Sequence, residues 1–222
     1  MNRKNLKYIF SLLMAVLALS SCSETNEDEA TTEFANWQEI NEKAFSDTLS
    51  YARQQIDNGS KEWKVILNWS LQNQTPNKDA NGNVATLNYN DDDHIIVHVL
   101  KEGTGTTIPA YTDSIKLSYR GRLLPSPSYT NGYVFDQTFE GNYDKATALP
   151  TSTTVMGGSS GWIDGFTTAL SSMHVGDHWM VFMPYNLAYG TSGYNGIPGY
   201  SLLRFEMVLD TYKPANGKWI TE

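Results

Sequence analysis

The chain has 222 residues, 40% of them hydrophobic, which is enough for one domain with an extension or for two small domains. Its formal net charge is −8, with 24 acidic against 16 basic residues, and no basic face or nucleic-acid-binding motif is present in the sequence. A phosphate backbone would be repelled, so nucleic-acid-binding proteins are excluded as a class. The single cysteine, Cys22, leaves no pair for a structural disulfide.

The N-terminus has the features of an export signal. Basic residues precede an apolar run from Tyr8 to Leu19, which is too short to span a bilayer comfortably. The run ends in "LSSC", where small residues precede Cys22, and this pattern resembles the lipobox of bacterial lipoproteins. The sequence therefore predicts a lipoprotein signal peptide at 1–21, with Cys22 as the lipidated residue. An ordinary secretory peptide with an incidental thiol is the alternative.

The segment 22–33 contains the acidic stretch "ETNEDEA" and is predicted to be a solvated tether. In some Gram-negative bacteria an acidic run directly after the lipidated cysteine resembles a surface-export signal. The expected location is the Gram-negative cell envelope, with a lipid anchor in the outer membrane and the protein either periplasmic or exposed at the surface.

Residues 34–90 are predicted to form an N-terminal extension made of a helix and a connector. Apolar residues recur at helical spacing in its first part, namely Phe34, Trp37, Ile40, Ala44, Phe45, Leu49, Ala52 and Ile56. A glycine stop follows in "DNGS" at 57–60. Three roles are considered for the aromatic side chains Trp37 and Phe45: pairing with a second copy in a homodimer, holding unfolded chains, or packing against the protein's own C-terminal domain.

The remainder of the extension is a short apolar segment and a polar connector. "EWKVILNWSL" at 62–71 fits either a helix or a strand, and an Asn-Gly turn is expected at 81–82. The stretch 77–88 imitates a calcium-binding loop, with Asn88 in place of the closing glutamate. A hairpin turn is favoured over a calcium site because the loop lacks that carboxylate.

After Asp93 the pattern changes to short strands. "DSIKLSYRG" at 113–121 alternates cleanly, with Ile115, Leu117 and Tyr119 on one face. The other expected strands are "HIIVHVL", "GYVFDQT", "HWMVFMP" and a final strand in which Leu203, Phe205, Met207 and Leu209 face inward. One amphipathic helix, "IDGFTTALSSM" at 163–173, interrupts them. This order predicts an α+β domain over 91–214, in which the helix covers one face of an antiparallel sheet, and a tail at 215–222.

Two further patterns are candidates for a catalytic or a metal site. "GGSSG" at 157–161 fits the Gly-x-Ser-x-Gly elbow of serine hydrolases, with Ser159 as nucleophile, but that motif needs a strand-to-helix turn in a large parallel sheet. A glycine-rich turn that enters the helix is favoured, and the hydrolase is kept as an alternative. The four histidines form two pairs with no third ligand nearby, so neither a metal nor a cofactor is predicted.

An ordered set of short motifs occupies the C-terminal half. "LSYRG" precedes "GYVFD", and then come "GWIDGFTTALSSMHVGDHW", "MPYNLAYG", "GIP" and a strand that ends in "FEMVLD". In this order and spacing the chain resembles the FKBP-type peptidyl-prolyl cis-trans isomerases. The match extends over approximately 93–213, a little over half the chain, and leaves residues 23–90 outside it.

The resemblance implies a fold and a pocket. The fold is an antiparallel half-barrel sheet wrapped on one short helix (FKBP-like), with an apolar pocket between them. The residues that match the pocket of the family are Tyr119, Phe135, Asp136, Ile163, Phe166, Tyr189, Ile197 and Phe205. Phe166 stands where the family usually has a tryptophan, and Trp162 and Tyr194 are taken as further substrate contacts.

The resemblance also implies roles for these residues. The backbone N–H of Ile163 and the hydroxyl of Tyr189 are the expected donors to the substrate, and Asp136 is a polar group at the pocket edge. The implied substrates are proline-containing, unfolded or partly folded polypeptides, and a macrolide is a possible ligand. Thr153 falls where the family places an aromatic wall. An FKBP-fold binding or chaperone module with little turnover is therefore the alternative to an isomerase.

Isomerisation of X-Pro bonds would not require an acid–base, nucleophile or metal motif, which agrees with the lack of a convincing one in the sequence. Rotation about an X-Pro bond has a barrier of about 18–20 kcal/mol because resonance keeps the amide planar. No atom has to be attacked or deprotonated to lower that barrier. The twisted amide is less polar than the planar one, so an apolar aromatic pocket favours the transition state over the ground state.

Overall fold

The structure is a computed structural model that describes residues 33–78, 80–158 and 161–220. Asn36–Glu222 form one compact unit. The predicted signal peptide, Cys22 and all but the last residue of the predicted tether lie outside the described residues, and so does Ser159. Within the described ranges, no helix combines the length and the apolar character that crossing a membrane requires.

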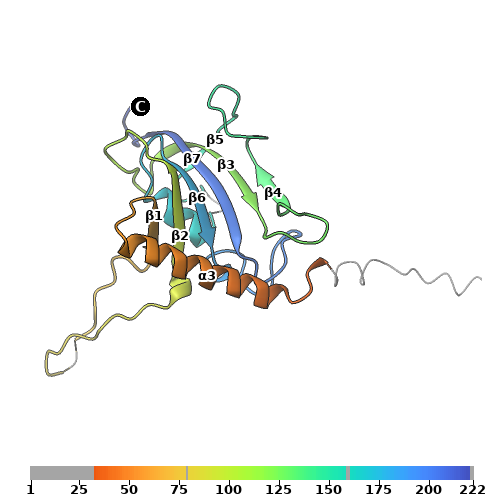
Figure 1. Ribbon diagram of the computed structural model, residues 1–222. Coiled ribbons are helices and arrows are strands. Elements are labelled where there is room, and N and C mark those ends of the chain that lie inside the picture. Colours follow the sequence, from red (N-terminus) through yellow and green to blue (C-terminus); the bar gives the residue numbers. More distant parts are fainter. Residues whose placement is uncertain (1–32, 79, 159–160, 221–222) are drawn as a thin grey trace, which may run out of the picture. The chain divides into compact units, whose positions relative to one another are not determined.

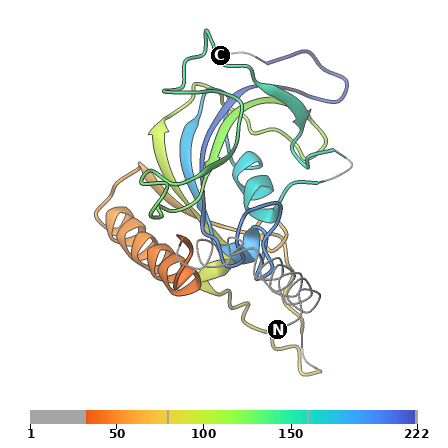
Figure 2. The ribbon, with the colours of Figure 1, turned by 90° about the vertical axis from the view of Figure 1, so that its right-hand side faces the viewer.

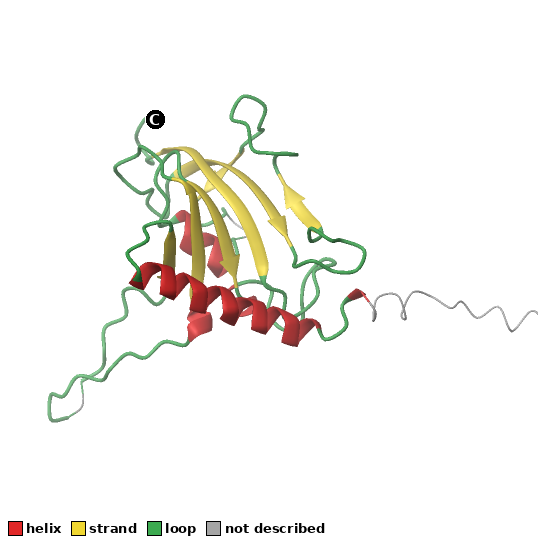
Figure 3. Cartoon of the chain, viewed as in Figure 1, coloured by secondary structure: helices red, strands yellow, loops and turns green. Residues whose placement is uncertain are grey.

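A seven-stranded antiparallel sheet forms the centre of this unit (Figures 1 and 3). Its strands are β1 (Trp63–Leu67), β2 (His94–Lys101), β3 (Ser114–Arg122), β4 (Val134–Gln137), β5 (Thr151–Thr154), β6 (His178–Met183) and β7 (Leu203–Lys213). They follow the order β1-β2-β6-β7-β3-β4, and β5 also pairs with β3. Two short 3-10 helices, η1 (Asp91–Asp93) and η2 (Tyr185–Leu187), precede β2 and follow β6. The predicted α+β fold class is confirmed.

The two central strands alternate as their sequences predict. Tyr119 on β3 lies opposite Met207 on β7, and both side chains are buried. On the other face Arg120 lies opposite Glu206, and the two side chains form an ion pair at 2.6 Å. One face of the central strands therefore belongs to the core, while the other carries charge.

The short strand β5 is not predicted by the sequence patterns. Its residues, "TSTT", are small and polar and lack the apolar alternation that marks a strand. It forms because it pairs with the first residues of β3, from Ser114 opposite Thr154 to Leu117 opposite Thr151. Tertiary pairing overrides the weak local signal here.

Helices α3 (Trp37–Asp57) and α4 (Asp164–Leu170) lie on opposite faces of the sheet, as Figures 1 and 2 show together. α4 falls within the helix predicted at 163–173 and buries Phe166, Ala169 and Leu170. Gly165 in α4 lies so close to β6 that an added Cβ would be 2.9 Å from Met183 Cγ. α4 is thus held tightly on the apolar face of the sheet.

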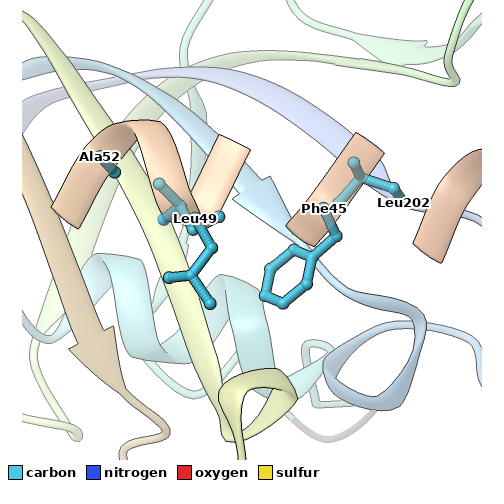
Figure 4. Close-up of a cluster of buried hydrophobic side chains, with 5 residues drawn as sticks. Phe45, Leu49, Ala52 and Leu202 are labelled. Carbon is cyan, nitrogen blue, oxygen red and sulfur yellow. The ribbon is translucent and has the colours of Figure 1, made fainter. Parts of the chain in front are cut away.

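α3 packs its apolar face on the outer side of the sheet. Phe45, Leu49 and Ala52 form a buried cluster with Ile96 of β2 and with Leu202 (Figure 4). Phe45, Leu49 and Ala52 are 7%, 2% and 0% exposed, respectively, so the cluster excludes water. Burial of apolar surface therefore attaches the N-terminal helix to the sheet.

The side chains that share the helical spacing of α3 do not all face the core. Ile40 and Ile56 stay 45% and 37% exposed, although their spacing matches the apolar face. Trp37 and Phe45, by contrast, are each 7% exposed because they pack on this chain itself. The structure therefore agrees with the expectation that Trp37 and Phe45 pack against the protein's own C-terminal domain.

The segment between α3 and β2 contains the strand that the sequence left ambiguous. Residues 63–67 form β1, which pairs with β2 from Trp63 opposite His98 to Leu67 opposite His94. The Trp63 and His98 rings stack with centroids 4.5 Å apart. Further along, Lys78 bridges to Val84 and Gly82 has a φ of +83°, as expected for a hairpin turn.

Candidate active site

A pocket of about 440 Å³ opens between α4, the central strands and the loop after η2. Its lining residues are Tyr119, Phe135, Asp136, Gly161, Trp162, Ile163, Phe166, Tyr189, Tyr194 and Phe205. The structure thus brings together all the side chains that the sequence assigns to the pocket except Ile197. The volume is in the range typical of sites for small ligands or for a few residues of a peptide.

The floor of the pocket is a cluster of aromatic rings packed edge to face. Phe166 of α4 lies 5.5 Å from the Tyr119 ring and 5.0 Å from the Phe205 ring, with interplanar angles of 84° and 75°. Phe135 of β4 meets Phe205 at 5.4 Å and 83°. Trp162 lies 4.8 Å from Phe166. Such contacts stabilise the rings in one arrangement and leave an apolar surface.

A glycine on β3, Gly121, makes room for two of these rings. A Cβ built on Gly121 would lie 2.5 Å from Phe135 Cζ and 2.6 Å from Phe205 Cε1. No other residue type fits without displacing the rings. Gly121 is not among the site residues predicted from the sequence, although a glycine inside an alternating strand is a known sign of close approach of another group to the backbone.

The polar edge of the pocket is formed by Tyr119 and Asp136. The Tyr119 hydroxyl donates a hydrogen bond to Asp136 Oδ2 at 2.7 Å. Burial raises the pKa of Tyr119 well above its ordinary value, and the hydrogen bond to Asp136 and the charge of that carboxylate raise it further. Tyr119 is therefore protonated at physiological pH and remains a donor to Asp136.

The rim is formed by the loop that follows η2. The Tyr189 and Tyr194 rings stack with centroids 5.1 Å apart and an interplanar angle of 18°. Burial raises the pKa of Tyr189, and the nearby Asp136 carboxylate adds to the effect, so the Tyr189 hydroxyl is protonated and able to donate. Tyr194 is 62% exposed, so a bound peptide could contact it directly.

Ile197 supports this rim without lining the pocket. Tyr194 and Ile197 exchange two backbone hydrogen bonds, at 3.0 and 2.9 Å, which close a tight turn. The Ile197 side chain is 6% exposed and belongs to the core. Ile197 therefore shares a turn with the pocket residue Tyr194 but is not among the lining residues, and its role in the site stays a prediction.

Ile163 occupies the N-cap position of α4 and lies at the pocket edge. Its carbonyl accepts hydrogen bonds from the backbone N–H groups of Phe166 and Thr167, at 3.0 and 3.1 Å. Its φ of −62° and ψ of 150° direct the chain from the preceding glycine-rich turn into the helix. The first turn of α4 therefore determines where the Ile163 backbone stands.

Residues 105–210 match the family model described as FKBP-type peptidyl-prolyl cis-trans isomerase. The chain carries an FKBP-type domain. The residues that line the pocket all fall inside this range. The family match and the pocket geometry thus concern the same part of the chain.

Three curated proteins illustrate the likeness of the FKBP-type domain. A macrophage infectivity potentiator of Trypanosoma cruzi is 35% identical over 120 residues, which cover 54% of this chain and 53% of that protein. The FKBP-type 22 kDa peptidyl-prolyl cis-trans isomerase of Escherichia coli is 37% identical over 112 residues, covering 50% and 46%. The peptidyl-prolyl cis-trans isomerase Mip of Coxiella burnetii is 31% identical over 101 residues, covering 46% and 36%. The chain spans about half the length of the first two relatives.

Thr153 lies apart from the pocket of the FKBP-type domain. It is on β5, opposite Ile115 of β3, and does not belong to the pocket lining. Trp162, by contrast, belongs to the lining, and its indole Nε1–H donates to the Thr154 carbonyl at 3.4 Å. The Trp162 ring, just before α4, therefore lines the pocket and is hydrogen-bonded to β5.

Asp177 and His178 are the acid and the histidine that a serine hydrolase would need after Ser159, and both are engaged in other contacts. Asp177 is 3% exposed, and its carboxylate accepts hydrogen bonds from the backbone N–H groups of Gly103 and His174, both at 2.7 Å. His178 binds Glu206 at 2.9 Å. Both side chains thus have structural partners. Within the described ranges, no three His, Cys, Asp or Glu residues are grouped so that they could hold a metal ion.

Proposed function

We propose that this protein is a peptidyl-prolyl cis-trans isomerase that accelerates rotation about X-Pro bonds in exported polypeptides. The observation that carries the proposal is the aromatic pocket, which lies wholly inside the part of the chain that matches the isomerase family. An uncatalysed X-Pro bond isomerises in tens to hundreds of seconds, which limits the folding of many chains. A catalyst of this step would serve proline-containing proteins that are unfolded or partly folded.

The proposed mechanism is preferential binding of the twisted amide. The proline ring of the substrate would enter the apolar pocket against Phe166 and Phe205. Planar amides are more polar than twisted ones, so removal from water costs the ground state more than the transition state. Phe166 and Phe205 are only 2% and 4% exposed, so the floor offers an apolar surface from which water is largely excluded.

The chain on either side of the twisted bond has to be fixed for this preference to act. We assign this role to two donors, the Tyr189 hydroxyl and the backbone N–H of Ile163. Tyr119 and Asp136 would hold the polar edge of the pocket through their 2.7 Å hydrogen bond. Fixing both sides of the amide converts binding energy into a lower barrier, because free rotation of the flanking chain no longer has to be arrested.

The direct test is the rate of prolyl isomerisation in a short peptide, measured with the purified protein by a protease-coupled assay. An active isomerase should accelerate the reaction in proportion to enzyme concentration, and a macrolide ligand of this family should inhibit it. Phe205→Leu should lower kcat/KM, because it removes an aromatic ring from the floor. A wild-type protein that leaves the uncatalysed rate unchanged would refute the proposal.

The same domain could instead bind unfolded chains without turning over the prolyl bond. The sequence motivates this alternative because Thr153 falls where the family has an aromatic wall, although Thr153 lies outside the pocket lining and Trp162 is part of it. A binding module would suppress aggregation of a denatured client while leaving prolyl isomerisation at the uncatalysed rate. Parallel measurement of both activities, in the wild type and in Phe205→Leu, separates the two functions.

We further propose that the protein is a lipid-anchored protein of the Gram-negative cell envelope. This proposal rests on the "LSSC" pattern and on the acidic segment that follows it. Cells expressing the wild type should incorporate labelled palmitate into the protein, and Cys22→Ala should abolish the label. Incorporation that persists in Cys22→Ala would contradict the assignment of the lipidated residue.

The proposed organisation is a signal peptide at 1–21, a tether at 22–33, an extension at 34–90, an isomerase domain at 91–214 and a tail at 215–222. A homodimer through α3 also stays a prediction. Because Trp37 and Phe45 are buried, a dimer would have to use exposed side chains such as Ile40 and Tyr51, which are 45% and 51% exposed. Gel filtration at several concentrations measures this directly.

A further inference from the structure

Two side chains of α3 bind the segment that directly follows the pocket rim. The indole Nε1–H of Trp37 donates to Ser201 Oγ at 2.8 Å. One turn further along α3, Asn41 Oδ1 accepts a hydrogen bond from the backbone N–H of Leu202 at 2.8 Å. The Asn41 amide also donates to the Trp37 carbonyl at 2.6 Å, which couples the two contacts.

Both contacts are removed from water. Asn41 is 1% exposed and Ser201 is 3% exposed. Asn41 is the polar residue of a buried helix face that otherwise consists of Trp37, Phe45, Leu49 and Ala52. A polar group is disfavoured in such a place unless it is hydrogen-bonded, so its bond to Leu202 accounts for its presence. Packing of α3 on the sheet alone would need no asparagine at this position.

Ser201 and its neighbour Tyr200 also form hydrogen bonds within the loop at the pocket rim, residues 188–200, called the rim loop. Ser201 Oγ–H donates to the Pro198 carbonyl at 2.6 Å. The backbone N–H of Tyr200 donates to the Gly190 carbonyl at 3.0 Å, directly after the pocket residue Tyr189. The base of the rim loop is therefore closed by hydrogen bonds.

Close packing at the same place leaves the loop base little freedom. A Cβ added to Gly199 would lie 1.9 Å from the Thr191 carbonyl oxygen, so the backbones of the two ends of the rim loop are in contact. Tyr200 next to it has a φ of +61°, which a bulky side chain rarely adopts. Such a conformation persists only where surrounding contacts impose it. Here the hydrogen bond that Tyr200 donates to Gly190 and the hydrogen bond that Trp37 donates to Ser201 hold the chain on either side of the strained residue.

We propose that Trp37 and Asn41 are positioning residues of the pocket: from α3 they hold the base of the rim loop and thereby the placement of Tyr189 and Tyr194. Both lie outside the pocket lining and outside the residues that match the family model. The N-terminal helix is thus part of the site. The expected effect on turnover rests on the proposed function, whereas the effect on the order of the loop does not.

The experiment compares amide hydrogen exchange and isomerase kinetics in the purified full chain. Trp37→Phe removes the indole donor and keeps an aromatic ring, and Ser201→Ala removes the other end of the same bond. The amides to follow are those of Tyr194, Ile197 and Tyr200, because each is hydrogen-bonded within the rim loop. Each variant should accelerate exchange at these amides by about two- to tenfold, the effect of losing one hydrogen bond. It should also lower kcat/KM by about the same factor.

Ala52→Gly is the matched control. Ala52 lies on the same buried face of α3, 0% exposed, about 22 Å along the helix from Trp37. The substitution should lower the melting temperature without changing exchange in the rim loop or kcat/KM, since it weakens the helix but leaves the hydrogen bonds from Trp37 to Ser201 and from Leu202 to Asn41 in place. All variants are compared well below their melting temperatures.

The double variant Trp37→Phe with Ser201→Ala completes the test. If Trp37 acts through its bond to Ser201, the double variant should show the same exchange rates as Ser201→Ala alone, which also removes the bond to the Pro198 carbonyl. Unchanged exchange at all three amides in both single variants would overturn the inference, and so would an equal acceleration in Ala52→Gly. If the wild type shows no isomerase activity, the proposed function fails while the exchange data still decide whether α3 orders the loop.

Discussion

Replacement of Gly121 by alanine tests whether the arrangement of the pocket rings controls activity. The added methyl carbon would lie 2.5 Å from Phe135 Cζ and 2.6 Å from Phe205 Cε1. Carbon atoms in contact prefer separations of about 3.5–4.0 Å. Both atoms belong to ring side chains of the pocket, so at least one ring has to retreat by about 1 Å. A change of one methyl group is thereby converted into a change in the shape of the site.

The expected magnitudes differ for stability and activity. Overpacking of a core by one methyl group costs about 1–3 kcal/mol, and in a domain of this size each kcal/mol lowers Tm by about 2–4 °C. A displacement of about 1 Å within a site can cost up to about 100-fold in rate. We expect Gly121→Ala to fold, with Tm lowered by several degrees, and kcat/KM to fall about tenfold or more, which corresponds to at least ~1.4 kcal/mol.

Prolyl isomerisation and thermal unfolding should be measured on the same preparations. Gly217→Ala is the matched control, because the three atoms nearest to its added Cβ all belong to the Pro214 side chain, at 3.1–3.2 Å, and neither residue lines the pocket. Phe135→Leu in the Gly121→Ala background should restore part of the activity by making room for the methyl group. Retention of kcat/KM within about twofold of wild type in Gly121→Ala would refute the argument, since such a difference is under ~0.5 kcal/mol.

Three further outcomes are expected. Tyr189→Phe should lower kcat/KM by about fivefold with little change in Tm, because it removes a hydrogen-bond donor worth about 1 kcal/mol, as steady-state kinetics will show. Leu49→Ala should lower the free energy of unfolding by about 2–5 kcal/mol in urea titrations, because Leu49 is 2% exposed in the α3 cluster. The third concerns pH. Burial raises the pKa of Glu206, but hydrogen bonds with His178 and Arg120 outweigh it, so the folded-state pKa is below its ordinary value of 4.5. A depressed carboxylate pKa stabilises the fold above the unfolded-state pKa, and this stability is lost as pH falls below about 4.5 through the folded-state pKa. Tm of the wild type should therefore decline in that range, and the decline should be shallower in Glu206→Gln.

Much of the fold and site follows from local sequence patterns. The alternation of β3 and β7 predicts which face of each strand is buried, because successive side chains point to opposite faces of a sheet. The same period places Tyr119 and Phe205 on the core side, where both line the pocket. The helical spacing of "IDGFTTALSSM" likewise places Phe166 toward the sheet.

Other features depend on residues far apart in the sequence. Strand β5 exists because β3 offers it a partner, and its own residues carry no strand signal. Ile197 and Tyr194 lie three residues apart in one turn, yet only Tyr194 lines the pocket. The period of a strand or helix does not apply in such a turn, so the direction of each side chain follows from the particular backbone angles.

The resemblance of the C-terminal motifs to a known family implied which aromatic residues line a pocket, whereas the amino-acid order alone determined that this chain has an N-terminal amphipathic helix and an α+β domain of antiparallel strands. These properties are periodic or local, and neighbours in the chain are sufficient to specify them. The tertiary structure decided that Gly121 makes space between Phe135 and Phe205 and that Asn41 reaches across to Leu202. These contacts join segments separated by up to 161 positions, and only the packed fold brings such groups within bonding distance.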